Sequence, residues 1–296
     1  MRRVLGDPAG QGEFESQGYV TVPVLSPTEL NDLLNAVQNL HPEGDVRSGD
    51  GSSVVFSPAD PSTARRRQMQ QLLQPLFEPH IRRLLPDFRF FSGIYLIKPP
   101  GSTGFGWHTD WQLTADWSDV SVRIWLPLTD PGSQTLRVVD GSHRFAREMG
   151  APVPVGFFAP FTDELDRRSR GLAINPGEAV LFDSGLVHRS VANQSSRAMV
   201  AVQVTAIPAD ATPVFCLRAG DARYELIDAS GEFWIDNNFL GPDAERQPHW
   251  RGLGFVEDPD QHSWEREFRL LFDVEERTGR GRTRWRSLRR HPSTTG

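Results

Sequence analysis

Residues 179–203 read AVLFDSGLVHRSVANQSSRAMVAVQ. An apolar strand in this stretch ends in His188 and Ser190, a polar Asn-Gln-Ser-Ser turn follows, and a second apolar strand begins with Arg197. If the turn closes a hairpin near residues 193–195, Arg197 folds back beside Ser190. The pattern therefore predicts an antiparallel pair of strands that gathers a histidine, a serine and an arginine in one place.

Short strands of the same kind fill the middle of the chain. Segments rich in β-branched and aromatic residues recur at 88–97, 120–128, 135–139, 171–174, 179–182, 187–191 and 197–207. Turn dipeptides such as Pro-Gly and Asp-Gly separate several of them. Seven or more closely spaced strands with few helices between them predict a β-sandwich or jelly roll, and they disfavour alternating β and α units.

Two helical segments precede these strands. Residues 26–29, Ser-Pro-Thr-Glu, form a capping box with proline at the first helical position, and the helix that they begin should run to about Leu40. Residues 63–85 also have a helical pattern, in which Pro75 and Pro79 are expected to break the helix in two. We interpret both segments as supports packed against the larger β structure.

The length of 296 residues and the hydrophobic fraction of 38% fit one large β domain. We expect a single domain over residues 1–276, with a jelly-roll core at about 86–207. The part at 209–276, with a helix expected at 263–276, would either cap the barrel mouth or pad its outside. The single cysteine, Cys216, rules out a disulfide within the chain.

Charge is unevenly distributed along the chain. Residues 277–296 hold seven of the 32 basic residues and no acid, so residues 1–276 keep 25 basic against all 38 acidic side chains, a net charge of −13. This acidic body argues against nucleic acid as a ligand, and the basic tail is expected to be a flexible, solvated terminus. No signal sequence follows Met1 and no run of ~20 apolar residues occurs, so we expect no membrane partner and a cytoplasmic protein.

The densest chemical signal is at residues 106–111, GWHTDW, where His108 and Asp110 stand two positions apart. On an extended segment both side chains project from the same face and can reach one ion. With His188, the pair completes the two-histidine, one-carboxylate ligand set of non-haem Fe(II) oxygenases. That set leaves three positions open for a bidentate acid and then O₂, and an arginine such as Arg197 offers a planar fork to the far carboxylate of the acid.

Six segments between residues 13 and 207 carry a resemblance to a known family. They are 14–23, FESQGYVTVP; 97–100, IKPP; 108–110, HTD; 125–130, WLPLTD; 136–143, LRVVDGSH; and 188–190, HRS. Together they resemble the phytanoyl-CoA hydroxylase-like family of Fe(II)- and 2-oxoglutarate-dependent dioxygenases. In the fifth segment, Asp140 stands where the family has a proline.

This resemblance implies a mostly β fold with flanking helices, the double-stranded β-helix of jelly-roll, cupin-like proteins. It also implies that His108, Asp110 and His188 hold Fe(II), and that 2-oxoglutarate and O₂ are the co-substrates. Hydroxylation of a substrate coupled to decarboxylation of 2-oxoglutarate to succinate is then the default reaction, with desaturation, ring closure and further oxidation left open. Related halogenases carry Ala or Gly at the position of Asp110, so the carboxylate there disfavours halogenation.

The same resemblance implies a pocket for 2-oxoglutarate. Its distal carboxylate would meet Arg197 and Ser190, and Trp125 would line the pocket. Arg197 follows the second histidine by nine positions, one or two fewer than in many relatives. For this reason Arg189 and Arg123 stay open as alternatives to Arg197.

The substrate is argued from the residues near the metal motif. Aromatic walls are expected from Phe105, Trp107, Trp111 and Trp117. Acidic side chains that favour a neutral or cationic molecule over an acyl-CoA are Asp116, Asp119 and Asp236. We hypothesise a small metabolite, such as an amine-bearing sugar or an amino-acid derivative, in secondary metabolism.

Two alternatives belong to other classes of function. In the first, the same residues hold a structural metal or none, in a non-catalytic jelly-roll binding or regulatory module. Structural zinc sites are usually closed by four protein ligands, which disfavours this alternative. The second is nucleic-acid demethylation, which would make the arginine-rich tail at 277–296 essential.

Overall fold

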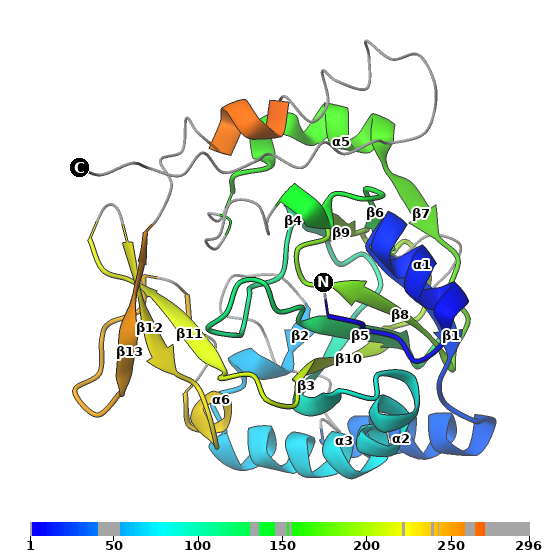
Figure 1. The fold of residues 1–296 in the computed structure, drawn as a ribbon. Helices are drawn as coiled ribbons and strands as arrows, with labels where there is room; N and C mark the ends of the chain where they lie inside the picture. The colour runs from blue at the N-terminus through cyan, green and yellow to red at the C-terminus, as the bar shows by residue number, and fades with distance from the viewer. Residues whose placement is uncertain are drawn as a thin grey trace, which may run out of the picture.

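The computed structural model describes residues 2–40, 54–130, 136–145, 153, 156–220, 223–237, 240–241, 243–257 and 264–269. Within these ranges, antiparallel strands form two main sheets (Figure 1). The larger sheet consists, in spatial order, of β1 (Tyr19–Pro23), β8 (Glu178–Asp183), β5 (Val122–Pro127), β10 (Met199–Pro208), β3 (Phe88–Lys98) and β2 (Val55–Phe56). The smaller sheet consists of β4 (Phe105–His108), β9 (His188–Ser190), β6 (Leu136–Val138) and β7 (Arg170–Leu172).

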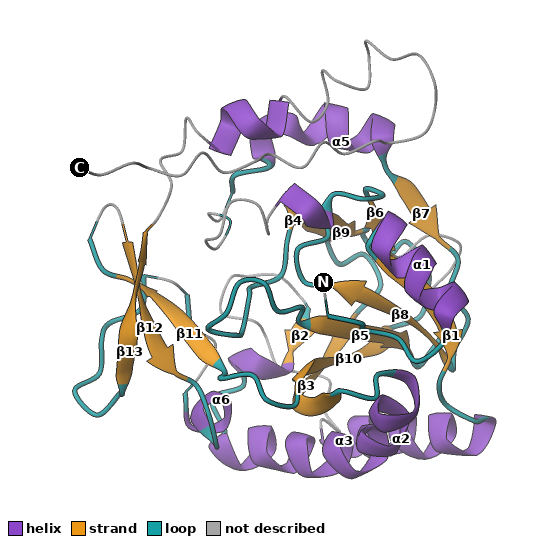
Figure 2. Ribbon diagram, in the orientation of Figure 1, coloured by secondary structure: helices purple, strands orange, loops and turns teal. Residues whose placement is uncertain are grey.

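All seven strands predicted from the sequence are present, and the mostly β, jelly-roll fold class is confirmed. Helices flank the sheets (Figure 2). They are α1 (Pro8–Gln17), α2 (Pro27–Leu40), α3 (Thr63–Leu84), α5 (Thr162–Arg168) and α6 (Phe233–Asp236), with the 3-10 turns η1 (Ser57–Ala59) and η2 (Ala159–Phe161). The predicted capping box forms at α2: the Ser26 amide donates to Glu29 Oε2 at 2.8 Å, and the Glu29 amide donates to Ser26 Oγ at 3.3 Å.

Helix α1 was not predicted from the residue pattern, although it has clear local signals. Asp7 caps its first turn by accepting from the Gly10 amide at 2.7 Å, and proline follows at Pro8. Gly18 ends the helix with φ +90°, in the left-handed region. A Cβ at Gly18 would lie 2.5 Å from Nδ1 of His143, so both the turn and the close packing require glycine there.

Helix α3 runs unbroken from Thr63 to Leu84, so the predicted break at Pro75 and Pro79 is wrong. Both prolines lie on the exposed face of the helix, where water can solvate the carbonyl groups that lose their amide partners. The opposite face packs into the core through buried side chains at helical spacing: Met69, Leu73, Phe77 and Ile81. Burial of this apolar stripe against the sheet outweighs the local preference for a break.

Helix α3 packs on the outer face of the larger sheet, where α2 lies beside it (Figure 1). The pairing of β3 with β10 shifts register between Thr205 and Ala206. Near this irregularity, the Gln70 side chain donates to the Gly93 carbonyl at 2.7 Å and accepts from the Gly93 amide at 2.9 Å. An amide side chain of α3 thus satisfies strand groups that the ladder leaves unpaired.

The inner faces of the two main sheets pack against each other. A buried cluster joins Trp125, Val180, Phe182 and Ala201 of the larger sheet to Leu136 and Val138 of the smaller one. Along β5 and β10 the inward residues alternate with residues that pack toward α3, as the two-residue period of a strand requires. Functional side chains of these strands can therefore share one interior space.

The C-terminal part contains a third sheet that the sequence analysis did not predict. Its order is β11 (Val214–Arg218), β12 (Arg223–Asp228) and β13 (Gly252–Glu257), and it lies beside the two main sheets (Figure 1). The Val214 amide donates to the Leu113 carbonyl, and the Ala115 amide donates to the Thr212 carbonyl, both at 2.9 Å. The third sheet thus borders the loop that follows the metal motif.

Part of the helix expected at 263–276 is described, because residues 264–269 are helical. Trp264 and Phe268 pack there into an aromatic cluster with Phe157, Phe161 and other residues near α5. The loop at 41–53 and the basic tail at 277–296 lie outside the described residues. Among the helices that the structure describes, none has both the length and the apolar composition needed to cross a bilayer.

The contact of α3 with β3 predicts a compensating pair of substitutions. A Cβ at Gly93 would lie 2.4 Å from Cδ1 of Leu73, so Gly93→Ala should overpack the interface and cost about 1–3 kcal/mol. Leu73→Ala removes buried methyl groups and should cost about 2–5 kcal/mol. The double variant should cost less than the sum, because the leucine carbons that obstruct the alanine are gone. Urea unfolding of all four proteins measures this coupling, and strict additivity would contradict the packing.

Candidate metal centre

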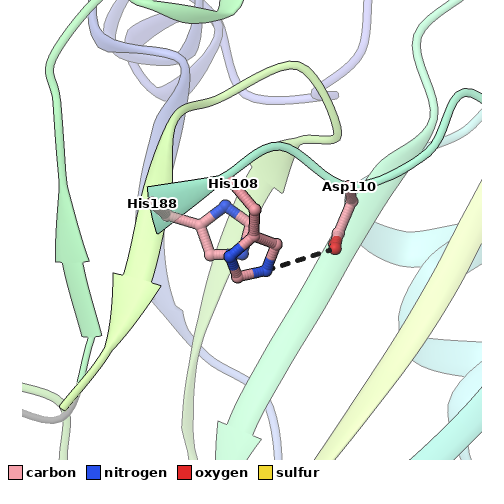
Figure 3. Close-up of side chains that lie close together, drawn as sticks. All are labelled: His108, Asp110 and His188. Carbon is pink, nitrogen blue, oxygen red and sulfur yellow. Dashed lines mark ion pairs between the residues drawn. The ribbon is translucent and has the colours of Figure 1, made fainter. Parts of the chain in front are cut away.

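The two histidines of the candidate centre lie on paired strands. Strand β4 pairs antiparallel with β9, with His108 directly opposite His188 and Phe105 opposite Ser190. Cross-strand partners of this kind share one face of a sheet and have Cβ atoms ~5 Å apart. The two imidazole rings accordingly lie with their centroids 4.2 Å apart (Figure 3).

Asp110 comes from the segment just beyond the end of β4 and turns back toward the same point. Its Oδ1 lies 3.9 Å from Nε2 of His108. One ligand atom from each of His108, Asp110 and His188 lies within 4.8 Å of the others (Figure 3). The structure therefore brings together the three side chains that the sequence analysis proposed as metal ligands.

Backbone carbonyl groups fix the orientation of both rings. Nδ1 of His108 lies 2.7 Å from the Gly106 carbonyl, and Nδ1 of His188 lies 2.9 Å from the Leu186 carbonyl. A carbonyl only accepts, so each Nδ1 carries the proton and each Nε2 keeps its lone pair for a metal. Burial, with the charge of His108 as a second cause, lowers the pKa of His188 to about 4, and this ring is neutral at pH 7.

The Asp110 carboxylate is held through its other oxygen. Oδ2 lies 3.0 Å from Nε of Arg123 and accepts from Nε2 of Gln203 at 3.1 Å, which leaves Oδ1 facing the histidines. Burial raises the pKa of Asp110, but the charge of Arg123, the two neighbouring histidines and the hydrogen bond from Gln203 together lower it by more, so the net shift is downward. Asp110 is ionised at neutral pH and presents one oxygen to the centre.

The donor set fits a divalent transition metal with open coordination positions. Two imidazole nitrogens and one carboxylate oxygen suit Fe(II), and in the described residues no fourth His, Cys, Asp or Glu joins the group. Structural zinc sites normally have four protein ligands, so three ligands favour a reactive centre. The His108 side chain is 41% exposed, whereas His188 is buried, so the group opens on the His108 side.

Arg197 does not take the place that the hairpin prediction gave it. Strand β9 belongs to the smaller sheet and β10 to the larger one, so the predicted ladder between them is wrong. Arg197 is exposed, and its backbone carbonyl accepts from Nδ2 of Asn193 and Oγ of Ser195, both at 2.8 Å. The chain crosses between sheets here because His188 pairs with β4 and Met199 pairs with β3.

The two alternative arginines are engaged elsewhere. Arg123 contacts Asp110, donates to Thr205 Oγ1, and donates to the Trp111 carbonyl at 2.8 Å. Arg189 forms an ion pair with Asp166 at 3.0 Å, and its guanidinium lies 5.0 Å from the Trp107 ring centroid.

The other two residues predicted to contact 2-oxoglutarate are Ser190, on the strand of His188, and Trp125, opposite Gln203 of β10. Ser190 is two residues from His188 on the same strand, and Trp125 is buried on the inner face of β5. The Ser190 hydroxyl accepts from Nζ of Lys98 at 2.7 Å. Lys98 was missed as a site residue by the sequence analysis, which quoted it only within the IKPP motif.

The four predicted aromatic wall residues do not all face the centre. Trp107 precedes His108 on β4, packs into the aromatic cluster near α5, and donates from Nε1 to Asp166 at 2.9 Å. Trp111 packs against the aromatic cluster of the third sheet, and Trp117 is half-buried in the loop before β5. Phe105 is 38% exposed and remains a candidate wall of the site.

The predicted acidic groups are partly neutralised. Asp119 lies 3.8 Å from Nε of Arg2, and Asp236 lies 3.6 Å from Nη2 of Arg67. Asp236 belongs to α6, which contacts α3. Of the three acids proposed to attract a cation, Asp116 has no ion pair among the residues that the structure describes, and its carboxylate accepts from the Ser118 amide at 2.8 Å.

Comparisons with known proteins give a family and a fold. The family model of phytanoyl-CoA dioxygenase (PhyH) matches residues 14–199. The non-heme α-ketoglutarate-dependent carbocyclase SnoK from nogalamycin biosynthesis is similar in structure, with a TM-score of 0.54, 22% identity, and coverage of 70% of this chain and 86% of that one. The epimerase SnoN from the same biosynthesis has a TM-score of 0.50, 20% identity, and coverage of 71% and 86%. No curated protein sequence matches significantly.

A third solved structure is HygX from Streptomyces hygroscopicus with nickel, 2-oxoglutarate and hygromycin B bound. It has a TM-score of 0.48 and 16% identity, and the match covers 69% of this chain and 88% of that one. At these identities, the likeness to SnoK and SnoN concerns the fold.

Two glycines flanking Phe105 provide a matched test of the centre. A Cβ at Gly104 would lie 2.1 Å from the Ser190 carbonyl oxygen, so Gly104→Ala must push β4 away from β9. A Cβ at Gly106 would meet nothing within 4 Å. We expect Gly104→Ala to weaken cobalt(II) binding by about 10- to 100-fold, as changes around metal ligands do, and Gly106→Ala to leave it nearly unchanged. Equal affinities in a competition titration would contradict the pairing of β4 with β9.

Proposed function

The chain belongs to the phytanoyl-CoA dioxygenase family and is an Fe(II)- and 2-oxoglutarate-dependent dioxygenase, and from this premise we propose that it hydroxylates a small-molecule metabolite. The observation that carries the proposal is the open group of His108, Asp110 and His188. Its three ligands leave room for a bidentate keto acid and for O₂. A four-ligand structural site would leave none.

In this proposal, Nε2 of His108, Nε2 of His188 and Oδ1 of Asp110 hold the metal. The bound ferrous ion would supply O₂ activation coupled to oxidative decarboxylation of 2-oxoglutarate to succinate and CO₂. The backbone carbonyls on both Nδ1 atoms keep the rings in the tautomer that binds metal. Arg123 and Gln203 keep the carboxylate turned inward, and Phe182 packs 4.8 Å from the His188 ring centroid and excludes water from that side.

Asp110 also bears on the reaction type. A carboxylate at this position fills the coordination place that a halide would need, so we propose oxygen insertion and not halogenation. SnoK and SnoN are described as a carbocyclase and an epimerase, both from nogalamycin biosynthesis. Those descriptions support a metabolite of secondary metabolism as the substrate, and they leave ring closure and epimerisation as other outcomes of the same hydrogen abstraction.

We propose that the substrate is neutral or cationic. The net charge of −13 over residues 1–276 opposes a polyanion such as an acyl-CoA. The ion pairs of Asp119 and Asp236 reduce the attraction that these two carboxylates can exert on a cation. The proposal therefore rests on the net negative charge of residues 1–276 and on Asp116.

Turnover without added substrate tests the reaction class. The purified protein should release succinate from 2-oxoglutarate only when Fe(II) and O₂ are both present. His188→Ala should abolish this release, because two protein ligands hold the ion poorly, whereas His249→Ala, which removes an exposed histidine, should not change it. Succinate release that persists in His188→Ala would contradict the proposed ligand set.

Substrate charge has its own test. A tryptophan-fluorescence titration should show tighter binding of amine-bearing sugars or amino-acid derivatives than of CoA esters. Raising the ionic strength should narrow the difference, because salt screens the field of the acidic body. Tighter binding of the CoA esters would contradict the proposed preference.

A further inference from the structure

We propose that Asp166 of α5 is a positioning residue for the metal centre, because its carboxylate links the two strands that carry the histidine ligands. This role rests on the proposed function, since it presumes that His108 and His188 bind a metal ion. Asp166 does not face the ion. It acts through the chain neighbours of the two ligands, Trp107 and Arg189.

The pairing of β4 with β9 contains a bulge beside the ligands. Phe105 lies opposite Ser190 and His108 lies opposite His188, so three steps along β4 match two steps along β9. The extra residue lets Phe105 and His108 share one face of the sheet, although an odd number of positions separates them. A slip that removed the bulge would turn one of these two side chains to the other face.

Arg189 marks the position of the bulge on β9. It stands between His188 and Ser190, so its side chain projects from the opposite face of the strand. The two β4 residues across from it are Gly106 and Trp107. The Arg189 guanidinium lies 5.0 Å from the centroid of the Trp107 ring, a cation–π contact that joins the bulged segment to its partner strand.

Asp166 contacts both of these side chains. Its Oδ1 accepts from Nε1 of Trp107 at 2.9 Å and lies 3.0 Å from Nη1 of Arg189. The same Nη1 donates to Oδ2 at 3.3 Å. Figure 1 shows α5 on the far side of β4 and β9 from the larger sheet. One carboxylate therefore links the bulged strand to its partner, on the face opposite the two imidazoles.

Packing and hydrogen bonds fix the helix that carries this carboxylate. Leu165, next to Asp166, is fully buried in the same aromatic cluster as Phe268. Ser169 follows the end of α5, and its Oγ accepts from Nε of Arg137 on β6 at 3.1 Å. Arg137 in turn lies opposite the β9 arginine that Asp166 contacts. The carboxylate is therefore presented by a supported element, as precise positioning of a site requires.

The partial exposure of the contact separates positioning from global stability. The side chains of Asp166 and Arg189 are 39% and 28% exposed. Ion pairs at such positions add little to the free energy of unfolding, because water screens them. Two ligands that share one ion must instead keep their geometry to within about 0.5 Å. We therefore expect loss of the Asp166 carboxylate to weaken metal binding.

Cobalt(II) binding to two variants of α5 tests this role. Asp166→Ala should weaken cobalt(II) binding about 10-fold, the lower end of the range for groups that orient metal ligands. It should also change the visible d–d absorption of the bound ion, which reports the ligand geometry. Asp163→Ala removes an equal charge from an exposed position of the same helix and should change neither. Urea unfolding of the metal-free variants checks that both are folded.

A third variant tests whether the effect passes through Trp107. Trp107→Phe keeps an aromatic ring in the cluster and removes the Nε1–H donor. It should weaken cobalt(II) binding less than Asp166→Ala does, because the contact with Arg189 remains. In the Asp166→Ala background it should have almost no further effect, because the hydrogen bond is already lost. Two losses that simply multiply would contradict a shared route and overturn the proposed role.

A measurement on the unmodified protein does not depend on the folding of the alanine variant. If the Asp166 contact favours metal binding, metal binding must favour the contact to the same degree. The indole N–H of Trp107 should therefore exchange with solvent about 10-fold more slowly when zinc is bound. NMR of ¹⁵N-tryptophan-labelled protein measures this rate, and the signal is assigned by its absence from Trp107→Phe.

The outcomes separate the role of Asp166 from the proposed function. Equal cobalt(II) affinities and spectra in Asp166→Ala and Asp163→Ala, or an indole exchange rate that zinc does not change, would overturn the role of Asp166 and leave the proposed function intact. If the unmodified protein bound neither cobalt(II) nor zinc, the proposed function would fail, and the role of Asp166 with it.

Discussion

The whole metal centre depends on the pairing of β4 with β9, which sets His108 opposite His188. A shift of one residue in this register would turn one imidazole to the other face, where Trp107 now packs with the aromatic cluster near α5. Gly104 permits this close pairing, because any larger side chain there would meet the Ser190 backbone. The pairing also sets Ser190 two residues beyond His188 on the same strand, opposite Phe105.

The larger sheet supplies the side chains that orient the third ligand, Asp110. Arg123 and Gln203, on β5 and β10, reach inward and hold the one oxygen of Asp110 that does not face the histidines. Lys98, on β3, reaches the Ser190 end of the same space. The smaller sheet therefore contributes the imidazoles, and the larger sheet contributes most of the charge. The site therefore needs both sheets, because neither sheet alone holds the two imidazoles and the groups that orient Asp110.

Where the sequence patterns failed, longer-range packing had overridden a local preference. Pro75 and Pro79 predicted a broken helix, but both prolines face water while Leu73 and Phe77 bury the other side of α3. The Asn-Gln-Ser-Ser turn predicted a hairpin, but the strands that it joins belong to different sheets. In the C-terminal part, the third sheet was not predicted because β12 and β13 lack the near-continuous apolar runs of the central strands, and β13 is exposed along most of its length.

The sequence by itself determined the strand order along the chain, the capping box of α2 and the identity of the three candidate ligands, because these depend on local spacing and on the chemistry of residue types. Only the tertiary structure decided which basic residue lies beside Ser190. A side chain's neighbours across two sheets depend on register and on where the chain crosses between the sheets, and no local pattern encodes either. For this reason Arg197, well placed in the sequence, is exposed, while Lys98, ten residues before the metal motif, is buried in the interior.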